Sequence, residues 1–430
     1  MYLAGTKTGE VFFCHRLLVI ICLAASVFWG SKAIAFNVQY GLTHSVESTS
    51  NVLLAPETSS LTGIEDKINT SLIYVNLVES RSAIEMSADI QLSYLDYGKD
   101  DVSRDVTRNS LDSEILWNIT PGRFSWFVED NYLQTTIDPS LIFNQTNTQD
   151  VNEFGTGPQF KWIFKDTTLN LETYIYNYDY SETDNDATNS ITNLRWGKKM
   201  PSGMNLYLVY STTFVTYESD SVLSDYDKSS LSLNYQYTRA TNDFDVEIGK
   251  TYLNDDENSD SSFTNIEMSF TRRMSRHSNI NMSYSSGLAD QSETIDAGGT
   301  LLSNVFENQT SLIRYQKTSS ALGLVLEVVE IIRSNEESGF EDYLRTAEIS
   351  ISRVVAPRSQ IQLSYSDSDN RVDNLIDYTD SIIEKRFEYT KRFNDSLSFR
   401  FFVSDLAVSS NFDIREYTDK RVGLSLSIAR

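Results

Sequence analysis

The segment from Ile84 to Tyr94 places an apolar residue at every even position and a polar residue at every odd position. A β-strand sends successive side chains to opposite faces, so this segment has one apolar face and one polar face. A tilted strand needs roughly 9–11 residues to cross the hydrocarbon of a bilayer, and this segment is that long. It therefore predicts a membrane-spanning strand with one face toward lipid and one toward water.

The same pattern recurs along the chain in pairs of strands joined by tight turns. Turn signals lie at Pro121-Gly122, at Lys165-Asp166-Thr167, at Pro201-Ser202-Gly203 and at Ala356-Pro357-Arg358. Longer polar connections alternate with them, for example over 134–151, 181–189 and 287–303. Outer-membrane barrels place short turns in the periplasm and long loops outside. We therefore predict an all-β fold, a transmembrane antiparallel up-and-down β-barrel of about 20 strands (range about 16–20), with both termini in the periplasm.

The N-terminal segment has the features of an export signal. Arg16 precedes an apolar run over 17–29, and Ala33-Ile34-Ala35 supplies the small residues that a signal peptidase recognises. The run is shorter than the about 20 residues of a membrane helix. The prediction is a signal peptide over residues 1–35 and an outer-membrane barrel over 36–430. Cys14 and Cys22 both lie in the leader, so the mature chain is predicted to contain no disulfide and no thiolate metal site.

The charge balance excludes one class of partner. Removing residues 1–35 takes away three of the 36 basic and one of the 60 acidic residues, which leaves a net charge of −26. Nucleic acid is excluded as a partner because phosphate binding needs clustered Lys and Arg. Acidic clusters such as Asp184-Asn185-Asp186 fall in predicted loops. They are either solvated loop tips or ligands for divalent cations that bridge lipopolysaccharide.

Aromatic residues make up 12% of the chain, and tyrosine is the commonest of them. Many tyrosines fall near the ends of predicted strands, where a ring with one polar tip suits the headgroup region. The alternative is packing in the core of a soluble sandwich. The tyrosines predicted to form girdles at the membrane surfaces are Tyr94, Tyr97, Tyr178, Tyr180, Tyr217, Tyr237, Tyr252, Tyr284 and Tyr365.

The sequence offers little material for catalysis. His44 and His277 are the only histidines after the leader, and neither stands in a recognisable nucleophile–base motif. The chain has no HExxH sequence, no Cys/His metal spacing and no glycine-rich phosphate loop. We therefore expect a protein that is not an enzyme, with no catalytic residues, no cofactor and no bound metal.

The odd positions of the first segment, and their equivalents in other strands, are predicted to line the lumen. Carboxylates there favour cations, and amides and hydroxyls hydrogen-bond sugar hydroxyls. A lumen that only holds water is also polar, so both interpretations stay open. The candidate lumen-lining residues are Glu85, Asp89, Gln91, Glu247, Asn265, Glu267, Glu348, Gln362 and Arg400.

Four stretches resemble outer-membrane β-barrels associated with PEP-CTERM/exosortase systems and exopolysaccharide export. They are 40–52, Pro121-Gly122-Arg123-Phe124-Ser125-Trp126, Val305-Phe306-Glu307 and the closing segment 417–424. The resemblance implies a non-enzymatic barrel for polysaccharide export or assembly, and it brings no catalytic residues. The terminal segment 421–428 also resembles barrel assembly signals. Those signals usually end on an aromatic residue, whereas this chain ends Ala429-Arg430.

The sequence thus predicts an exported outer-membrane protein that serves as a conduit or assembly factor for exopolysaccharide. One alternative is a general diffusion porin for small solutes or cations. Another is a surface barrel whose acidic loops act as an adhesin. The expected partners are outer-membrane lipids and lipopolysaccharide, the barrel insertion machinery, polysaccharide and periplasmic export components.

Overall fold

The computed structural model describes most of the chain after the N-terminal segment. The described residues are 37–52, 54, 63–98, 106–136, 148–183, 185–200, 203–218, 224–255, 261–290, 305–335, 340–373, 378–412 and 415–430. The predicted signal peptide and Asp184 of the predicted acidic cluster lie outside them. None of the described residues forms a helix that is long and apolar enough to span a membrane.

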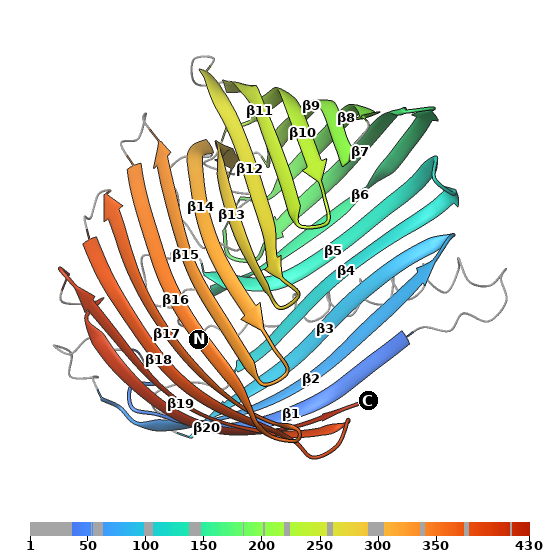
Figure 1. Ribbon diagram of the computed structural model, residues 1–430. Coiled ribbons are helices and arrows are strands. Elements are labelled where there is room, and N and C mark those ends of the chain that lie inside the picture. Colours follow the sequence, from blue (N-terminus) through green and yellow to red (C-terminus); the bar gives the residue numbers. More distant parts are fainter. Residues whose placement is uncertain are drawn as a thin grey trace.

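Twenty antiparallel strands form a single sheet (Figure 1). Each strand is 13–17 residues long, which exceeds what a bilayer crossing needs. The strands are β1 (Asn37–Thr49), β2 (Asp66–Arg81), β3 (Ile84–Tyr97), β4 (Val106–Thr120), β5 (Phe124–Thr136), β6 (Thr148–Phe164), β7 (Thr167–Tyr180), β8 (Ala187–Met200), β9 (Met204–Tyr217), β10 (Tyr226–Thr238), β11 (Asn242–Asp255), β12 (Ser261–Ser275), β13 (Ser278–Asp290), β14 (Val305–Thr318), β15 (Leu322–Asn335), β16 (Phe340–Ala356), β17 (Ser359–Asp373), β18 (Tyr378–Arg392), β19 (Leu397–Ser410) and β20 (Tyr417–Ala429).

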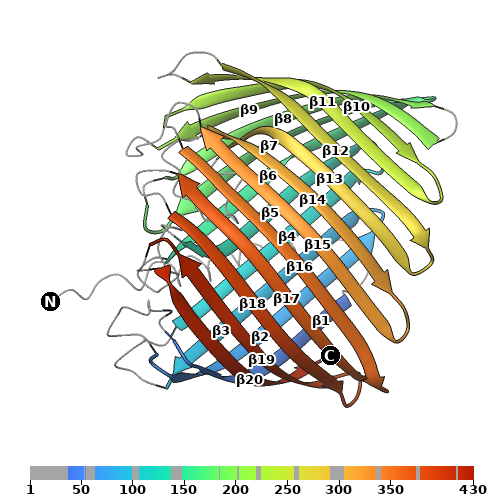
Figure 2. The same ribbon diagram turned by 60° about the vertical axis from the view of Figure 1, so that its left-hand side comes forward.

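Each strand pairs with its neighbours in sequence, and β1 pairs with β20, so the sheet closes into a barrel. The closing ladder runs from Gly41 opposite Ala429 to Thr49 opposite Arg421. Hairpin connections of two to four residues all lie at one end, and connections of four to sixteen residues lie at the other. Figure 2 shows the tilted strands and the end where the hairpins turn. These ends are called the short-turn end and the long-loop end. This confirms the predicted fold class and strand number.

Buried polar contacts at the long-loop end hold the closing seam together. The Asp419 side chain on β20 is fully buried and accepts a 2.7 Å hydrogen bond from the Thr49 hydroxyl on β1. Arg421 pairs with Asp419 at 2.5 Å and with Glu47 at 3.2 Å. A carboxylate inside a fold is stable only when it is paired in this way. The two ends of the chain's sheet are therefore joined by specific contacts as well as by backbone hydrogen bonds.

The register assigns a face to every strand residue. Large apolar side chains on one face, such as Leu208, Leu233 and Leu424, are 42–51% exposed, as expected of a lipid-facing surface in the absence of lipid. On β8–β10 and β18–β20 the opposite, mostly polar face is less exposed, because the curvature of the barrel crowds inward side chains. The same register continues around the sheet, so alternation fixes the inner face of each strand. On β3 and β4, Met86, Ala88 and Leu111 of the outer face are buried as well.

Two predictions need correction. The strands extend into the predicted connections: β5 ends at Thr136 and β6 begins at Thr148 within 134–151, β8 begins at Ala187 within 181–189, and β13 ends at Asp290 within 287–303. Strand pairing continues there through polar residues. Tyr97, Tyr178, Tyr180 and Tyr217 do not join an outer girdle, since the register turns them inward. Tyr178 and Tyr217 pack instead with Ala187, Val215 and Tyr226 in a buried cluster. Position near a strand end did not determine the face; odd or even position did.

Tryptophan marks the membrane boundary at the short-turn end. Trp117, Trp126, Trp162 and Trp196 all face outward within six residues of a short turn, and all are 38–57% exposed. Phe160 stacks on Trp162 with ring centroids 5.7 Å apart, which extends the band. Amphipathic rings prefer the interface between hydrocarbon and headgroups. Outward-facing Tyr94 and Tyr252 are exposed near the long-loop ends of their strands, whereas Tyr365 is exposed in the middle of β17.

Candidate functional site: the inner wall of the barrel

The inner wall is assembled from alternate residues of all twenty strands, and its chemistry changes around the barrel. On β3–β7 the inward ionisable side chains are carboxylates and tyrosines, apart from Arg108 near the long-loop end and Lys161 near the short-turn end. The acid–tyrosine wall comprises Asp89, Asp112, Glu114, Glu129, Glu153, Glu172, Tyr174, Tyr176 and Tyr178.

Hydrogen bonds fix the carboxylates and rings of the acid–tyrosine wall relative to each other. The Tyr176 hydroxyl donates to Glu129 at 3.3 Å, and the Tyr178 hydroxyl donates to Glu153 at 3.1 Å. The Tyr174 hydroxyl donates to Glu172 at 3.2 Å. The three rings follow one another along β7, with centroids 6.1 and 6.4 Å apart. The wall is thus a row of rings edged by negative charge.

Glycines make room for these rings. The Tyr176 ring occupies the space that a Cβ at Gly155 would take, and Gly41 accommodates Tyr74 in the same manner. The β6–β7 ladder skips Gly157 and Pro158, and a Cβ at Gly157 would overlap the carbonyl oxygen of Thr173. Gly in a strand often marks such a close approach. The Tyr176 ring therefore lies against the backbone of β6 at Gly155.

A second acidic group lies on β11 and β12. Glu247 and Glu267 face each other directly across the two strands, and Glu247 accepts a hydrogen bond from Ser232. Asp245 accepts from Asn234 and Gln236, both at 2.7 Å. Among the described residues, no group of three or more His, Cys, Asp or Glu side chains has the geometry to hold a metal ion.

The inner face of β17 carries no charge along its whole length. Ser364 and Gln362 on this face lie opposite Ser350 and Ser352 of β16. Ser368 shares a 3.0 Å hydrogen bond with Thr346. The uncharged stripe consists of Gln360, Gln362, Ser364, Ser366, Ser368 and Asn370. It runs from the short-turn end toward the long-loop end.

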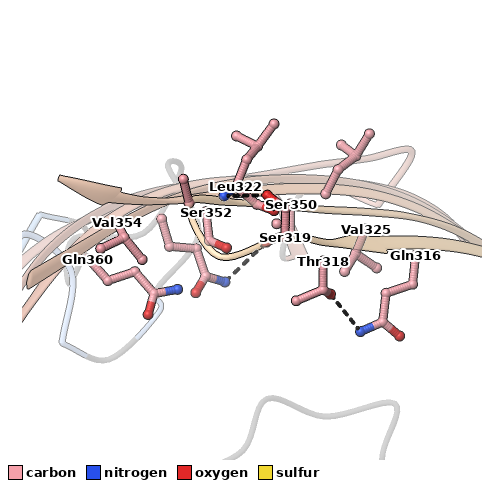
Figure 3. Close-up of a pocket in the computed structure, with 13 residues that line it drawn as sticks. Gln316, Thr318, Ser319, Leu322, Val325, Ser350, Ser352, Val354 and Gln360 are labelled. Atoms are coloured by element: carbon pink, nitrogen blue, oxygen red, sulfur yellow. Dashed lines mark hydrogen bonds between the residues drawn. The ribbon is translucent and has the colours of Figure 1, made fainter. Parts of the chain in front are cut away.

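A hollow of about 370 Å³ lies at the short-turn end of this stripe, between β14 and β17 (Figure 3). Gln362 donates a 3.1 Å hydrogen bond to the Ser350 hydroxyl inside it. None of its lining residues is charged, and Val325 and Val354 give it an apolar portion. A second, basic hollow adjoins it at the β12–β13 turn. Gln316 and Thr318 line both hollows, and Arg273 and Arg276 contribute the positive charge of the second one.

The structure places the nine candidate lumen-lining residues on the inner face, but it does not gather them into one site. Asp89 accepts a 2.9 Å hydrogen bond from Asn76, and Asn265 donates to Thr251. Glu348 stands opposite Glu327, and Arg400 lies 3.9 Å from Glu388. The remaining candidates are Glu85 and Gln91 on β3, the facing pair Glu247 and Glu267, and Gln362 in the hollow.

Sequence reasoning missed the acid–tyrosine wall and the buried Asp419. The alternation of β7 was the available signal. If the odd residues Leu169 and Leu171 face lipid, the even residues Tyr174, Tyr176 and Tyr178 face the lumen. Nothing in the sequence distinguishes Asp419 from the other acidic residues near strand ends. Its role depends on which strands meet at the seam.

Comparison with solved structures agrees with the fold. The ferric enterobactin receptor PfeA of Pseudomonas aeruginosa is similar to 93% of this chain over 81% of the receptor, with a TM-score of 0.50 and 8% identity. The fold is that of an outer-membrane β-barrel. Two further outer-membrane-type barrels of the same organism align with this one. The siderophore receptor PirA has a TM-score of 0.47 at 10% identity, covering 93% of this chain and 81% of the receptor. OccK8 (OprE) has a TM-score of 0.38 at 10% identity, covering 92% and 98%.

No family model and no curated protein sequence matches the chain. With identities this low, the likeness extends to the fold of the barrel and not to a ligand. Functional arguments therefore have to come from the inner wall itself.

Proposed function

We propose that the protein is a non-enzymatic conduit in the bacterial outer membrane, with exopolysaccharide as its cargo. One observation carries the proposal: a closed barrel of 20 strands has a polar inner face, while its described residues all belong to the wall, the turns or the loop edges. Barrels of this strand number enclose a lumen too wide for side chains alone to fill. Short turns would face the periplasm, where a polymer for export arrives.

The cargo assignment is supported by the chemistry of the wall. A sugar chain presents hydroxyls that exchange hydrogen bonds with water easily, and the uncharged stripe offers hydroxyls and amides along the direction of transport. The half-buried rings of Tyr174 and Tyr176 on β7 offer surfaces to the apolar faces of pyranose rings. Both features bind weakly and repeatedly, as a conduit requires, because tight binding would stop movement.

A diffusion porin for small cations is the second candidate. The acid–tyrosine wall favours it, since carboxylates along a pore raise the local concentration of cations. The two candidates differ in what a cell loses without the protein. A conduit for polymer is needed for polymer at the cell surface, whereas a porin is needed for uptake of small solutes.

Deletion of the gene tests the proposal in cells of the native host. We expect loss of surface polysaccharide, measured by extraction and sugar analysis, with uptake of a small hydrophilic dye unchanged. A complementing copy restores the polymer and serves as the control. Reduced dye uptake with normal polysaccharide would reject the export role and establish the porin.

A further inference from the structure

We propose that the uncharged hollow between β14 and β17 is a binding site for a neutral pyranose unit. In a conduit for polysaccharide it would be the first subsite that the polymer meets at the periplasmic mouth, so this inference rests in that respect on the proposed function. The hollow itself is defined by Gln316, Ser350, Ser352, Gln360 and Gln362 and by the adjacent β14–β15 turn.

The size and the lining of the hollow agree with a sugar. Its volume of about 370 Å³ lies near the lower end of the roughly 300–1,000 Å³ of ligand pockets, suited to one or two sugar rings. Side-chain amides supply both donors and acceptors, and serine hydroxyls can do either. Val325 and Val354 provide apolar contact. A pyranose presents the complementary set, with hydroxyls around its edge and C–H groups on its faces.

The surrounding charges argue for a neutral ligand. No lysine, arginine, aspartate or glutamate lines the hollow, so an ionic group placed there would lose water without gaining a partner. The carboxylate opposite Gln362 is Glu388, which is held by Arg386 at 3.3 Å and Arg400 at 3.9 Å. This neutralised neighbour differs from Glu129, Glu153 and Glu172 of the acid–tyrosine wall, which accept hydrogen bonds from tyrosines.

The local structure keeps the hollow open. The Ser319 hydroxyl donates to the Leu322 carbonyl at 3.0 Å and accepts from the Leu322 amide at 3.0 Å, which fixes the tight turn at its edge. Gly323, on the inner face of β15, has no side chain to fill the space beside Ser352. Figure 3 shows Gln316 and Gln360 extending from the wall on either side. Gln360 and Gln362 also begin the uncharged stripe, so a chain bound here is aligned with β17.

Calorimetry on the full protein, purified from membranes in detergent, tests the site. The probes are three soluble hexamers of matched length: cellohexaose, which is neutral, a chitosan hexamer and an oligogalacturonate hexamer. We expect cellohexaose to bind and the two charged hexamers to bind more weakly. Gln362→Glu should weaken cellohexaose binding by about tenfold, because a carboxylate replaces a donor in the hollow.

Gln39→Glu is the matched control. It introduces the same charge on the inner face of β1, near the short-turn end but outside the hollow. Ser352→Leu, which fills the hollow without adding charge, should also weaken binding. Heat-modifiable migration of each variant on a gel shows that the barrel has folded. Equal effects of Gln362→Glu and Gln39→Glu would overturn the proposal, as would a wild-type protein that binds no cellohexaose.

Two other outcomes separate the neutral sugar site from the basic hollow and from the conduit. Tighter binding of oligogalacturonate that Arg276→Gln abolishes would assign the ligand to the basic hollow and overturn the neutral site. Conductance in planar bilayers, measured on the same preparations, tests the conduit separately. If the barrel conducts ions but binds no sugar, the open conduit is supported and the sugar site is rejected. If the barrel does not conduct ions but binds cellohexaose in a way that depends on Gln362, the sugar site is supported and the open conduit is rejected.

Discussion

The acid–tyrosine wall and the uncharged stripe occupy the same face of one sheet, yet they are built in different ways. On β5–β7, the Tyr176 ring lies over Gly155, and Tyr176 and Tyr178 donate hydrogen bonds to Glu129 and Glu153. On β17, small hydroxyls and amides follow one another without a charged side chain. Near the short-turn end the outer faces of both regions carry apolar side chains, such as Leu171 and Leu363, because that zone faces lipid. Inward residues face water and can be charged, polar or aromatic, so the two regions differ in the chemistry of their inner faces.

The largest expected effect concerns ion selectivity. Replacing Glu114, Glu129 and Glu153 together by Gln should lower the preference for cations severalfold, because these carboxylates supply the negative potential of the acid–tyrosine wall. The reversal potential in a KCl gradient measures it. The effect should be much smaller at 1 M than at 0.1 M salt, since the Debye length falls from about 10 Å to about 3 Å.

The control for ion selectivity is a variant of the uncharged stripe. Replacing Ser364, Ser366 and Ser368 together by Ala changes three residues of the uncharged stripe and should leave the reversal potential unchanged. If this variant shifts the potential as much as the triple Glu variant, the two regions do not differ electrostatically as described.

An intermediate effect is expected on stability. Gly157→Ala should destabilise the barrel by about 1–3 kcal/mol, because the new methyl group meets backbone on β7 that cannot move aside easily. Gly287→Ala, on the inner face of β13, should cost less than about 0.5 kcal/mol, since its Cβ has 3.4 Å to the Asn265 side chain. Urea unfolding in lipid vesicles compares the two. Equal losses of unfolding free energy would show that Gly157 is not packed more tightly than Gly287.

The smallest effect is expected in the stripe. Ser366→Ala should change the free energy of unfolding by less than about 0.5 kcal/mol, because a hydroxyl in a water-filled lumen exchanges its hydrogen bonds with water. The same urea experiment measures it. A loss above 1 kcal/mol would mean that the stripe is a packed structural element and not a solvated surface.

Much of the architecture could be read from alternation alone. Segments such as Ile84–Tyr94 fixed strand type and face, and turn signals such as Pro121-Gly122 fixed hairpins; the left-handed Gly122, with φ of 70°, fits that turn. Strand ends were less predictable, because antiparallel pairing continues into polar sequence without any apolar pattern. Tyr178 and Tyr217 were placed on the wrong face because nearness to a strand end was given more weight than parity.

The candidate site was predictable in outline only. Parity placed Gln362, Glu247 and Arg400 on one face, but which of them share a hollow depends on the stagger between neighbouring strands. Gln316 on β14 and Gln362 on β17 line one cavity although 46 residues separate them in the sequence. Stagger is set by the closing of the whole barrel, including the contact between Asp419 and Thr49, and no local pattern records it.

Conductance of the purified barrel in a planar lipid bilayer tests the central claim most directly. We predict large, ohmic steps with a preference for potassium over chloride that the triple Glu variant reduces. A folded barrel that gives no steps would contradict an open conduit, and steps that favour chloride would contradict the electrostatic role of the acid–tyrosine wall.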